Sequence, residues 1–358
     1  MKKIRVAFLL LIIMSLSLTG CNNKELMKYA QEEQYRLENA GLTNLDIDNK
    51  NYGTIAYKFL EYIQNNLPGR IAGSEKEKET AALILNALLE GGYTENNIEI
   101  QNFEIGENSA PLEAVENNET FNGGALSDES NNIEVTKSGE SEKMIIVGAH
   151  YDSASTHGVI DNGSGISVVL ENALRMVNTR SPYTIRYVFF GAEEIGMYGS
   201  RAYVDSLSQK EKDNILFMVN IDCVESGDIA YLYGGYIDSD GIVQETWAVE
   251  HAYGLVQKLN LEIQLPPQGN LDYPFPTGQK RSDFTPFSDI GIPYIYFESN
   301  NWENGYPEET KEYGVITHTQ NDDLNFINQA FPQRVEETLT AYSELLYTLL
   351  KTDIVEQP

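Results

Sequence analysis

Short apolar runs alternate with longer helical patterns in the second half of this 358-residue chain, and this alternation constrains the fold most strongly. The runs are typical of buried strands: residues 144–149, 185–191, 215–221, 229–233 and 294–297. Between the first two runs, apolar residues from Ile166 to Val177 recur at helical spacing, as a crossover helix requires. We therefore predict a three-layer α/β fold, in which helices flank a mixed, largely parallel central sheet.

Other segments complete this picture with further helices and loops. Helical patterns cover residues 55–65, 75–89, 247–259 and 330–350, and residues 97–105 alternate like a strand. The polar stretch 106–139 predicts an exposed loop or hairpin, with a candidate short strand at 133–136. Residues 261–280 hold four prolines and predict a long loop, of the kind that often forms a substrate wall.

The charge balance excludes one broad class of partner. The chain has 54 acidic and 25 basic residues, for a formal net charge of −29. Nucleic-acid binding needs concentrated Lys and Arg to displace phosphate counterions, so a nucleic-acid partner is not expected. The acidic residues are spread along the chain, which favours a solvated acidic surface.

The first residues have the plan of a bacterial lipoprotein signal peptide. Lys2, Lys3 and Arg5 precede an apolar run over residues 7–18, which is short for a membrane span. Gly20 then precedes Cys21, as at a lipoprotein cleavage site, so we expect Cys21 to carry a lipid. A plain secretory signal or an uncleaved anchor remain alternatives. Each places the domain outside the cytoplasm, and the lipid would attach it to the cell membrane.

Three regions follow from these observations. We predict a signal peptide over residues 1–20, a stalk and lead-in over 21–51, and one enzyme-sized domain over 52–352. The second cysteine, Cys223, follows an apolar run, which favours a buried free thiol over a reactive one.

Potential metal ligands stand at the ends of the predicted strands. Ligands of open α/β sheets bind at the carboxyl ends of strands, so polar residues there are the first candidates for a site. The sequence places these residues there or in two adjoining polar loops: His150, Asp152, Asp161, Glu193, Glu194, Asp222 and His318. Two imidazoles with several carboxylates suit a pair of divalent cations, and a carboxylate can bridge both. The remaining histidines, His157 and His251, are not expected to be ligands.

At these residues the sequence resembles the M28 family of co-catalytic zinc peptidases, the bacterial leucyl aminopeptidase-like group. The resemblance covers residues 52–350. It rests on His-x-Asp at 150–152, Asp-Asn-Gly-Ser-Gly at 161–165 and Gly-Ala-Glu-Glu-Ile-Gly at 191–196, followed in order by Asp222 and His318. It implies the zinc-dependent exopeptidase fold and two zinc ions as cofactors.

The resemblance also implies a role for each residue. His150 and Asp222 would hold one zinc ion, Glu194 and His318 the other, and Asp161 would bridge them. Asp152 would contact the far nitrogen of His150 and fix its orientation. A cis peptide bond after Asp161 is expected by the same analogy.

The implied activity is hydrolysis of peptide bonds in peptide or protein substrates. Two close cations would generate a bridging hydroxide, and Glu193 would act as general base and later protonate the leaving amine. An aminopeptidase is the favoured form, although residue specificity and the choice between exo- and endopeptidase stay open. One segment departs from the family pattern, because Phe284 stands where a histidine is usual. Arg281 and Asp283 beside it remain candidates for the substrate cleft.

Two rival functions fit parts of the same pattern. A glutaminyl-cyclase-like acyltransferase shares the fold and the His-Tyr-Asp-Ser sequence at 150–153, but it works with a single zinc ion. A non-catalytic surface lipoprotein would keep the fold for binding alone. The intact ligand set and the presence of Glu193 favour the peptidase over both.

Overall fold

The computed structural model describes most of the chain from residue 40 to residue 354. The described residues are 26, 37–38, 40–106, 125–154, 156–237, 243–244, 247–267, 282–303 and 309–354. The expected signal peptide, Cys21, most of the expected stalk, Arg281 and most of the loop 261–280 lie outside them. Among the described helices, none combines the length and the apolar character that crossing a membrane would need.

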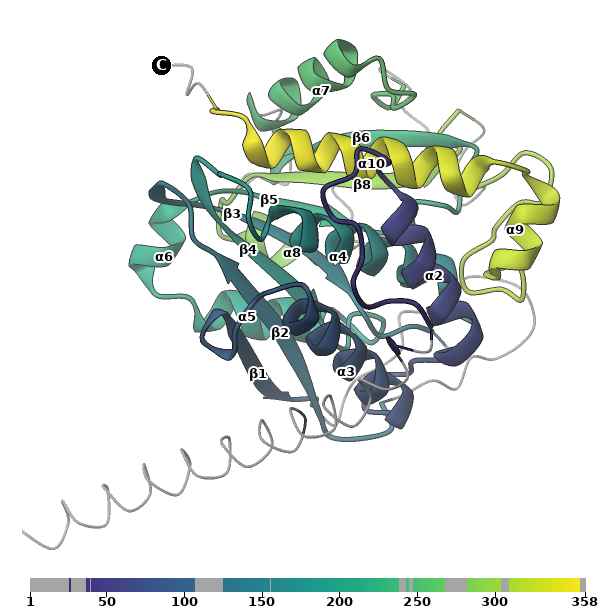
Figure 1. The fold of residues 1–358 in the computed structure, drawn as a ribbon, viewed down its shortest axis with the longest axis horizontal. Helices are drawn as coiled ribbons and strands as arrows, with labels where there is room; N and C mark the ends of the chain where they lie inside the picture. Colours follow the sequence, from purple (N-terminus) through teal and green to yellow (C-terminus); the bar gives the residue numbers. More distant parts are fainter. Residues whose placement is uncertain are drawn as a thin grey trace, which may run out of the picture.

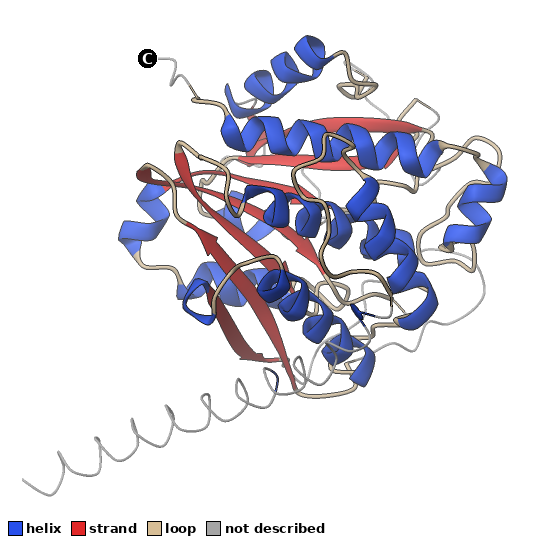
Figure 2. Cartoon of the chain, viewed as in Figure 1, coloured by secondary structure: helices blue, strands red, loops and turns tan. Residues whose placement is uncertain are grey.

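One sheet forms the middle of the molecule (Figures 1 and 2). Its strands follow the order β1-β2-β4-β3-β5-β8-β6-β7. The bounds are β1 Ile98–Glu104, β2 Glu129–Lys137, β3 Ser141–His150, β4 Tyr183–Phe190, β5 Ile215–Ile221, β6 Ile229–Ile237, β7 Val243–Gln244 and β8 Tyr294–Asn300. All the strands expected from the apolar runs are therefore present, and several are longer than the runs themselves.

The central strands are parallel and the outer strands are antiparallel. β4, β3, β5 and β8 pair in parallel. β1 and β2 at one side, and β6 and β7 at the other, pair antiparallel with their neighbours. The predicted α/β fold with a mixed sheet is confirmed, and the parallel core is the part that brings strand ends together.

The candidate strand at 133–136 is present within the segment 106–139, but it is longer than expected, as β2 (Glu129–Lys137), and it is not exposed. β2 lies inside the sheet, between β1 and β4. Its polar residues Ser130 and Asn132 are buried, and the Asn132 amide donates to Gln101 and to the Gly199 carbonyl. Buried but hydrogen-bonded polar side chains lower the apolar content of the strand, which is why its composition resembles that of a loop.

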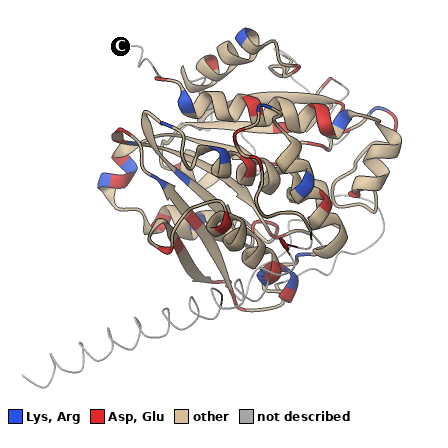
Figure 3. Cartoon of the chain, viewed as in Figure 1, with Lys and Arg blue, Asp and Glu red and all other residues tan. Residues whose placement is uncertain are grey.

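Helices cover both faces of the sheet. The bounds of those on the first face are α2 Thr54–Asn66, α3 Glu75–Glu90, α4 Gly165–Met176, α7 Trp247–Leu259 and α10 Arg334–Lys351. α5 Tyr198–Ser206, α6 Gln209–Asn214 and α8 Phe284–Asp289 lie on the other. Buried side chains form a separate apolar cluster on each face, so the three-layer arrangement is confirmed. Acidic residues are scattered over these elements (Figure 3).

Three short elements refine the expected helices. η1 (Glu95–Asn97) precedes β1, and η2 (Val159–Ser164) precedes α4. The helix expected over 330–350 is α10, which begins only at Arg334, because a separate helix, α9 (Leu324–Ala330), ends before Pro332. Proline lacks the backbone N–H that helix continuation needs, which explains the break.

The segment before α2 is fastened to α4 by hydrogen bonds to a buried ion pair that lies within α4. Arg175 Nε lies 2.7 Å from Glu171 Oε1, and Arg175 also donates to the Ile47 carbonyl. Glu171 in turn accepts from the amides of Gly53 and Ala56. Packing therefore reaches back before residue 52, while the division into stalk and domain stays a prediction.

Candidate metal centre

The carboxyl ends of three central strands meet at one edge of the sheet. β3 ends at His150, Asp222 follows β5 directly, and Glu193 and Glu194 lie in the turn after β4. Asp161 lies in η2, immediately before α4. Four of the segments singled out in the sequence thus reach the same place, as the parallel pairing of β4, β3 and β5 requires.

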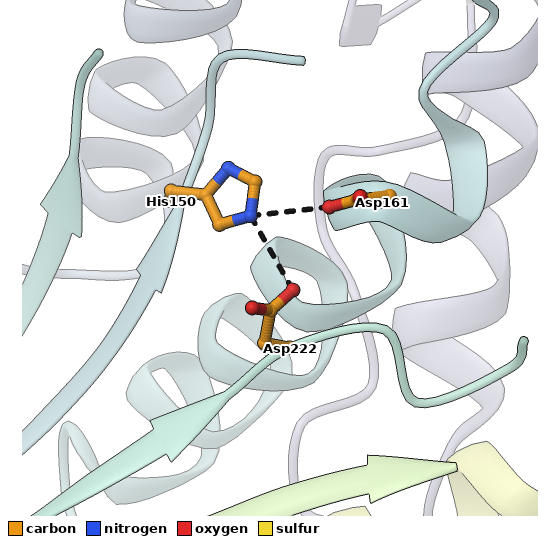
Figure 4. A group of neighbouring side chains, drawn as sticks. All are labelled: His150, Asp161 and Asp222. Carbon is orange, nitrogen blue, oxygen red and sulfur yellow. Dashed lines mark hydrogen bonds and ion pairs between the residues drawn. The ribbon is translucent and has the colours of Figure 1, made fainter. Parts of the chain in front are cut away.

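The first group of ligand atoms is formed by His150, Asp161 and Asp222 (Figure 4). His150 Nε2 lies 3.2 Å from Asp161 Oδ1 and 3.3 Å from Asp222 Oδ1. The three residues are only 1%, 7% and 6% exposed, respectively. This group is buried and is carried by two strand ends and by the start of a helix.

The second group is formed by Asp161, Glu194 and His318. His318 Nε2 lies 2.9 Å from Asp161 Oδ2 and 3.0 Å from Glu194 Oε2. The His318 side chain is 37% exposed, and the residue belongs to an irregular loop ahead of α9. This group is therefore closer to solvent than the first.

The two groups share Asp161, which directs one carboxylate oxygen to each histidine. A tetrahedral zinc ion with bonds of about 2.0–2.1 Å holds its ligand atoms roughly 3.3 Å apart. The measured separations of 2.9–3.3 Å between nitrogen and oxygen atoms match that spacing in both groups. The residues thus fit two zinc ions with a bridging carboxylate.

Carboxylates set the electrostatics of both histidines. Burial alone would lower the pKa of His150, but Asp222, Asp152 and Asp161 raise it well above its ordinary value. Glu194 raises the pKa of His318 in the same way, and Asp161 adds to that effect. An excess of carboxylate over imidazole gives the site a negative field, which attracts divalent cations.

Asp152 supports both the first histidine and the turn after β4. Its Oδ1 lies 3.4 Å from His150 Nδ1, which is an ion-pair contact longer than a good hydrogen bond. Asp152 also accepts hydrogen bonds from the backbone amides of Glu193 at 3.0 Å and Glu194 at 3.1 Å. One fully buried carboxylate thus orients a ligand from β3 and the turn that carries the predicted base.

Glu193 lies beside both groups without belonging to either. The residue is 5% exposed, and burial raises the pKa of its carboxyl group well above the usual value. A buried carboxylate with a raised pKa accepts a proton more readily than an exposed one. The position therefore suits proton transfer rather than metal binding.

Another buried carboxylate, Glu77, packs against the turn after β4. Its oxygens accept from the Gly73 amide at 2.6 Å and from Ser130 Oγ at 2.8 Å. A side chain at Gly191 would meet Ser130 Oγ at 2.4 Å and the Asn131 carbonyl at 2.6 Å. The turn is thus held tightly between β2 and α3. The sequence contains no motif that points to Glu77.

Sequence reasoning also missed the residues that hold Asp222. Ser282 Oγ donates to Asp222 Oδ2 at 2.8 Å, and the Tyr296 hydroxyl donates to the same oxygen at 3.2 Å. Cys223 is a free thiol, as expected, but it is half-buried and its Sγ lies 3.2 Å from Asp222 Oδ1. The only signal for Ser282 was its place in the segment that departs from the family pattern.

The remaining candidates are placed as follows. Asp283 is fully buried, and burial raises its pKa to about 7, so it does not lie on an open surface. Phe284 stacks on Tyr294, with ring centroids 4.1 Å apart. His157 faces Asp323 at 3.1 Å, and His251 lies in α7, so neither joins the two groups of ligand atoms among the described residues. The cis peptide bond expected after Asp161 is present.

Comparison with known protein families agrees with this geometry. The model for peptidase family M28 matches residues 131–343, which is more than half of the chain. The chain belongs to peptidase family M28. The matched span includes both groups of ligand atoms and Glu193.

Curated relatives extend the comparison to named proteins. Aminopeptidase YwaD of Bacillus subtilis is 33% identical over 201 residues, which cover 55% of this chain and 40% of YwaD. The probable lipoprotein aminopeptidase LpqL of Mycobacterium tuberculosis is 34% identical over 172 residues, 46% of this chain and 33% of LpqL. The alkaline phosphatase isozyme conversion protein of Escherichia coli is 26% identical over 328 residues, 84% of this chain and 90% of that protein. The chain thus spans less than half of the first two relatives and most of the third.

Solved structures share the fold of this M28 chain. The zinc aminopeptidase BSAP from Bacillus subtilis superposes with a TM-score of 0.65 at 22% identity, covering 84% of this chain and 96% of BSAP. The glutaminyl cyclase of Porphyromonas gingivalis gives a TM-score of 0.62 at 19% identity, covering 86% and 99%. Both confirm the three-layer α/β architecture.

Proposed function

We propose that this M28 family member is a zinc aminopeptidase that uses two metal ions. The observation that carries the proposal is the bridging position of Asp161, whose two oxygens face His150 at 3.2 Å and His318 at 2.9 Å. A carboxylate placed in this way, between two groups that each fit one zinc ion, is typical of two-metal hydrolases.

Each ion would have its own ligands. His150 and Asp222 would hold one, Glu194 and His318 the other, and Asp161 would bind both. When bound, two zinc ions supply Lewis acidity, which makes water more acidic and polarises a carbonyl group. The negative field of the surrounding carboxylates favours binding of both cations.

Glu193 would move the proton of the reaction. Its buried carboxylate would take a proton from the attacking water and return it to the leaving amine. Asp152 holds the backbone amide of Glu193, so the base is fixed relative to the ligands on the same turn. A water-poor setting keeps Glu193 basic enough for this transfer.

Release of N-terminal residues is the favoured form of the activity. Two of the relatives carry the name aminopeptidase, and a site rich in carboxylates suits a positively charged substrate α-amine. The glutaminyl-cyclase alternative works with one zinc ion. The presence of two ligand groups, one with His150 and one with His318, supports the peptidase over that alternative.

The deciding experiment combines metal analysis with activity. The purified protein should bind two zinc ions per chain and hydrolyse aminoacyl-nitroanilides, and a chelator should abolish that hydrolysis. One zinc ion with cyclase activity would establish the alternative. A lack of chelator-sensitive hydrolysis on every amino acid and peptide tested would support a non-catalytic binding lipoprotein instead.

We further propose that the protein is anchored outside the cytoplasm by a lipid on Cys21. The proposal rests on the sequence of residues 1–21 and on the likeness to LpqL, whose name describes a probable lipoprotein. Cys21→Ala should shift the protein from the membrane fraction to the soluble fraction of the producing cell. Membrane retention of that variant would contradict lipid anchoring.

A further inference from the structure

We propose that Glu309 is a positioning residue that holds His318 in its ligating place and so controls occupancy of the second metal site. The inference deepens the proposed function and rests on it. Glu309 lies nine positions before His318, at the far end of the same loop region. No sequence motif drew attention to it.

The carboxylate of Glu309 clamps the backbone immediately before His318. Its Oε2 accepts from the Ile316 amide at 2.6 Å and from the Thr317 amide at 3.0 Å. Its Oε1 accepts from the Thr317 hydroxyl. Three donors from two consecutive residues therefore converge on one side chain, which is 8% exposed.

Backbone hydrogen bonds fix Glu309 and the residue after it. Its carbonyl accepts from the Asp228 amide at 3.0 Å, in the segment that leads into β6. The next residue, Thr310, exchanges backbone hydrogen bonds with Gly314 at 2.9 and 3.0 Å. The clamp therefore connects the loop of His318 to the sheet.

His318 needs such a clamp because its backbone conformation is unfavourable. Its φ is 57°, in the left-handed region that side chains other than glycine rarely adopt. The Thr319 amide donates to the Ile316 carbonyl at 3.3 Å, so His318 occupies the third position of a four-residue turn. Strained conformations of this kind persist when neighbouring contacts over-determine them.

The two ligands at strand ends do not share this dependence. His150 ends a strand, and Asp222 directly follows one, so ladder hydrogen bonds fix their backbones. Glu309 touches neither of these residues in the described contacts. Loss of its carboxylate should therefore weaken the His318 site and leave the His150 site in place.

Zinc binding to the full chain tests this inference directly. Protein stripped with a chelator would be titrated with zinc by calorimetry in the presence of a competing chelator, to resolve two binding constants. Glu309→Ala should weaken one of them by about 10- to 100-fold, the range typical when a partner of a metal ligand is removed. Glu312→Ala is the matched control, because Glu312 is exposed in the same loop.

A second variant separates hydrogen bonding from charge. The amide oxygen of Glu309→Gln can still accept from the Ile316 and Thr317 amides, so its zinc affinity should lie between those of wild type and Glu309→Ala. This variant also serves if Glu309→Ala fails to fold. Loss of affinity equal to that of the alanine variant would overturn a positioning role through hydrogen bonds.

A double-mutant cycle shows whether Glu309 acts through His318. Adding Glu309→Ala to His318→Ala should leave zinc binding no weaker than in His318→Ala alone, because the residue it positions is gone. Equal weakening of both binding constants in Glu309→Ala, or no weakening of either, would overturn the inference. Wild-type protein that binds fewer than two ions would instead overturn the proposed two-metal function.

Discussion

The two halves of the metal centre differ in what holds their ligands. His150 and Asp222 come from the ends of β3 and β5 and are buried. Glu194 comes from a turn, and His318 comes from a loop and has a side chain that is 37% exposed. A sheet edge fixes the first half, whereas side chain–backbone contacts have to fix the second.

The supporting contacts differ in the same way. Ser282 and Tyr296 reach the Asp222 carboxylate itself, so they orient an already placed ligand. Glu309 reaches the backbone before His318 and determines where the ligand lies. We infer that the first half is preorganised and that the second is the more adjustable half.

The largest effect should come from Glu193, which belongs to neither half. Glu193→Gln removes the proton acceptor and should lower kcat by about 100- to 10,000-fold, the usual contribution of general acid–base catalysis. Both zinc ions should stay bound. Steady-state kinetics with metal analysis would check this, and near wild-type turnover in the variant would show that Glu193 is not the base.

Replacing each histidine should change the free energy of unfolding by a different amount in the two halves. His150→Ala breaks a buried charged contact and should lower the free energy of unfolding by about 3 kcal/mol. His318→Ala acts at a partly exposed contact and should cost about 1 kcal/mol or less. Urea denaturation of the metal-free variants would measure both. Equal losses would contradict the contrast between a buried and an adjustable half.

Asp152 should affect both halves together. Asp152→Asn keeps the shape of the side chain but turns an amide N–H₂ toward His150 or toward the amides of Glu193 and Glu194. Zinc affinity or kcat/KM should fall by about 10- to 100-fold, as for other partners of metal ligands. An effect on only one of the two zinc-binding constants would show that Asp152 serves one half alone.

The smallest effects should come from the two hydroxyl groups that donate hydrogen bonds to Asp222. Tyr296→Phe and Ser282→Ala each remove one hydrogen bond, for which about 1 kcal/mol of zinc binding is expected, or roughly fivefold in affinity. The loss should appear in the first half only. Tyr233→Phe is the control, because its hydroxyl donates to Glu298 at 2.6 Å and not to a ligand. A similar loss in that control would indicate a general packing effect.

The sequence predicts much of the first half and little of its support. Each strand end carries its ligand in a local pattern, so His150, Asp161 and Asp222 follow from apolar runs and short motifs. Ser282 and Tyr296 reach Asp222 only through tertiary contacts from distant segments, and Glu309 reaches the backbone before His318 across a loop without a recognisable motif. Spacing along the chain contains no signal for such contacts.

The fold was likewise predictable where a local apolar pattern marks an element, and not where such a pattern is missing. Apolar periodicity identifies the central strands and α4, because burial on both sides requires apolar side chains there. The first part of β2 escapes that signal because Ser130 and Asn132 are buried through hydrogen bonds instead. The short helices α5, α6 and α8 lack enough turns to show a period.

The buried pair of Arg175 and Glu171 gives the molecule a mechanical property. A force that pulls on the chain before Ile47 would pass through these contacts into α4. α4 begins at Gly165, four residues after the bridging ligand Asp161. Tension on the N-terminal segment would therefore enter the fold through Glu171 and Arg175, in the same helix that begins directly after the segment carrying the bridging ligand.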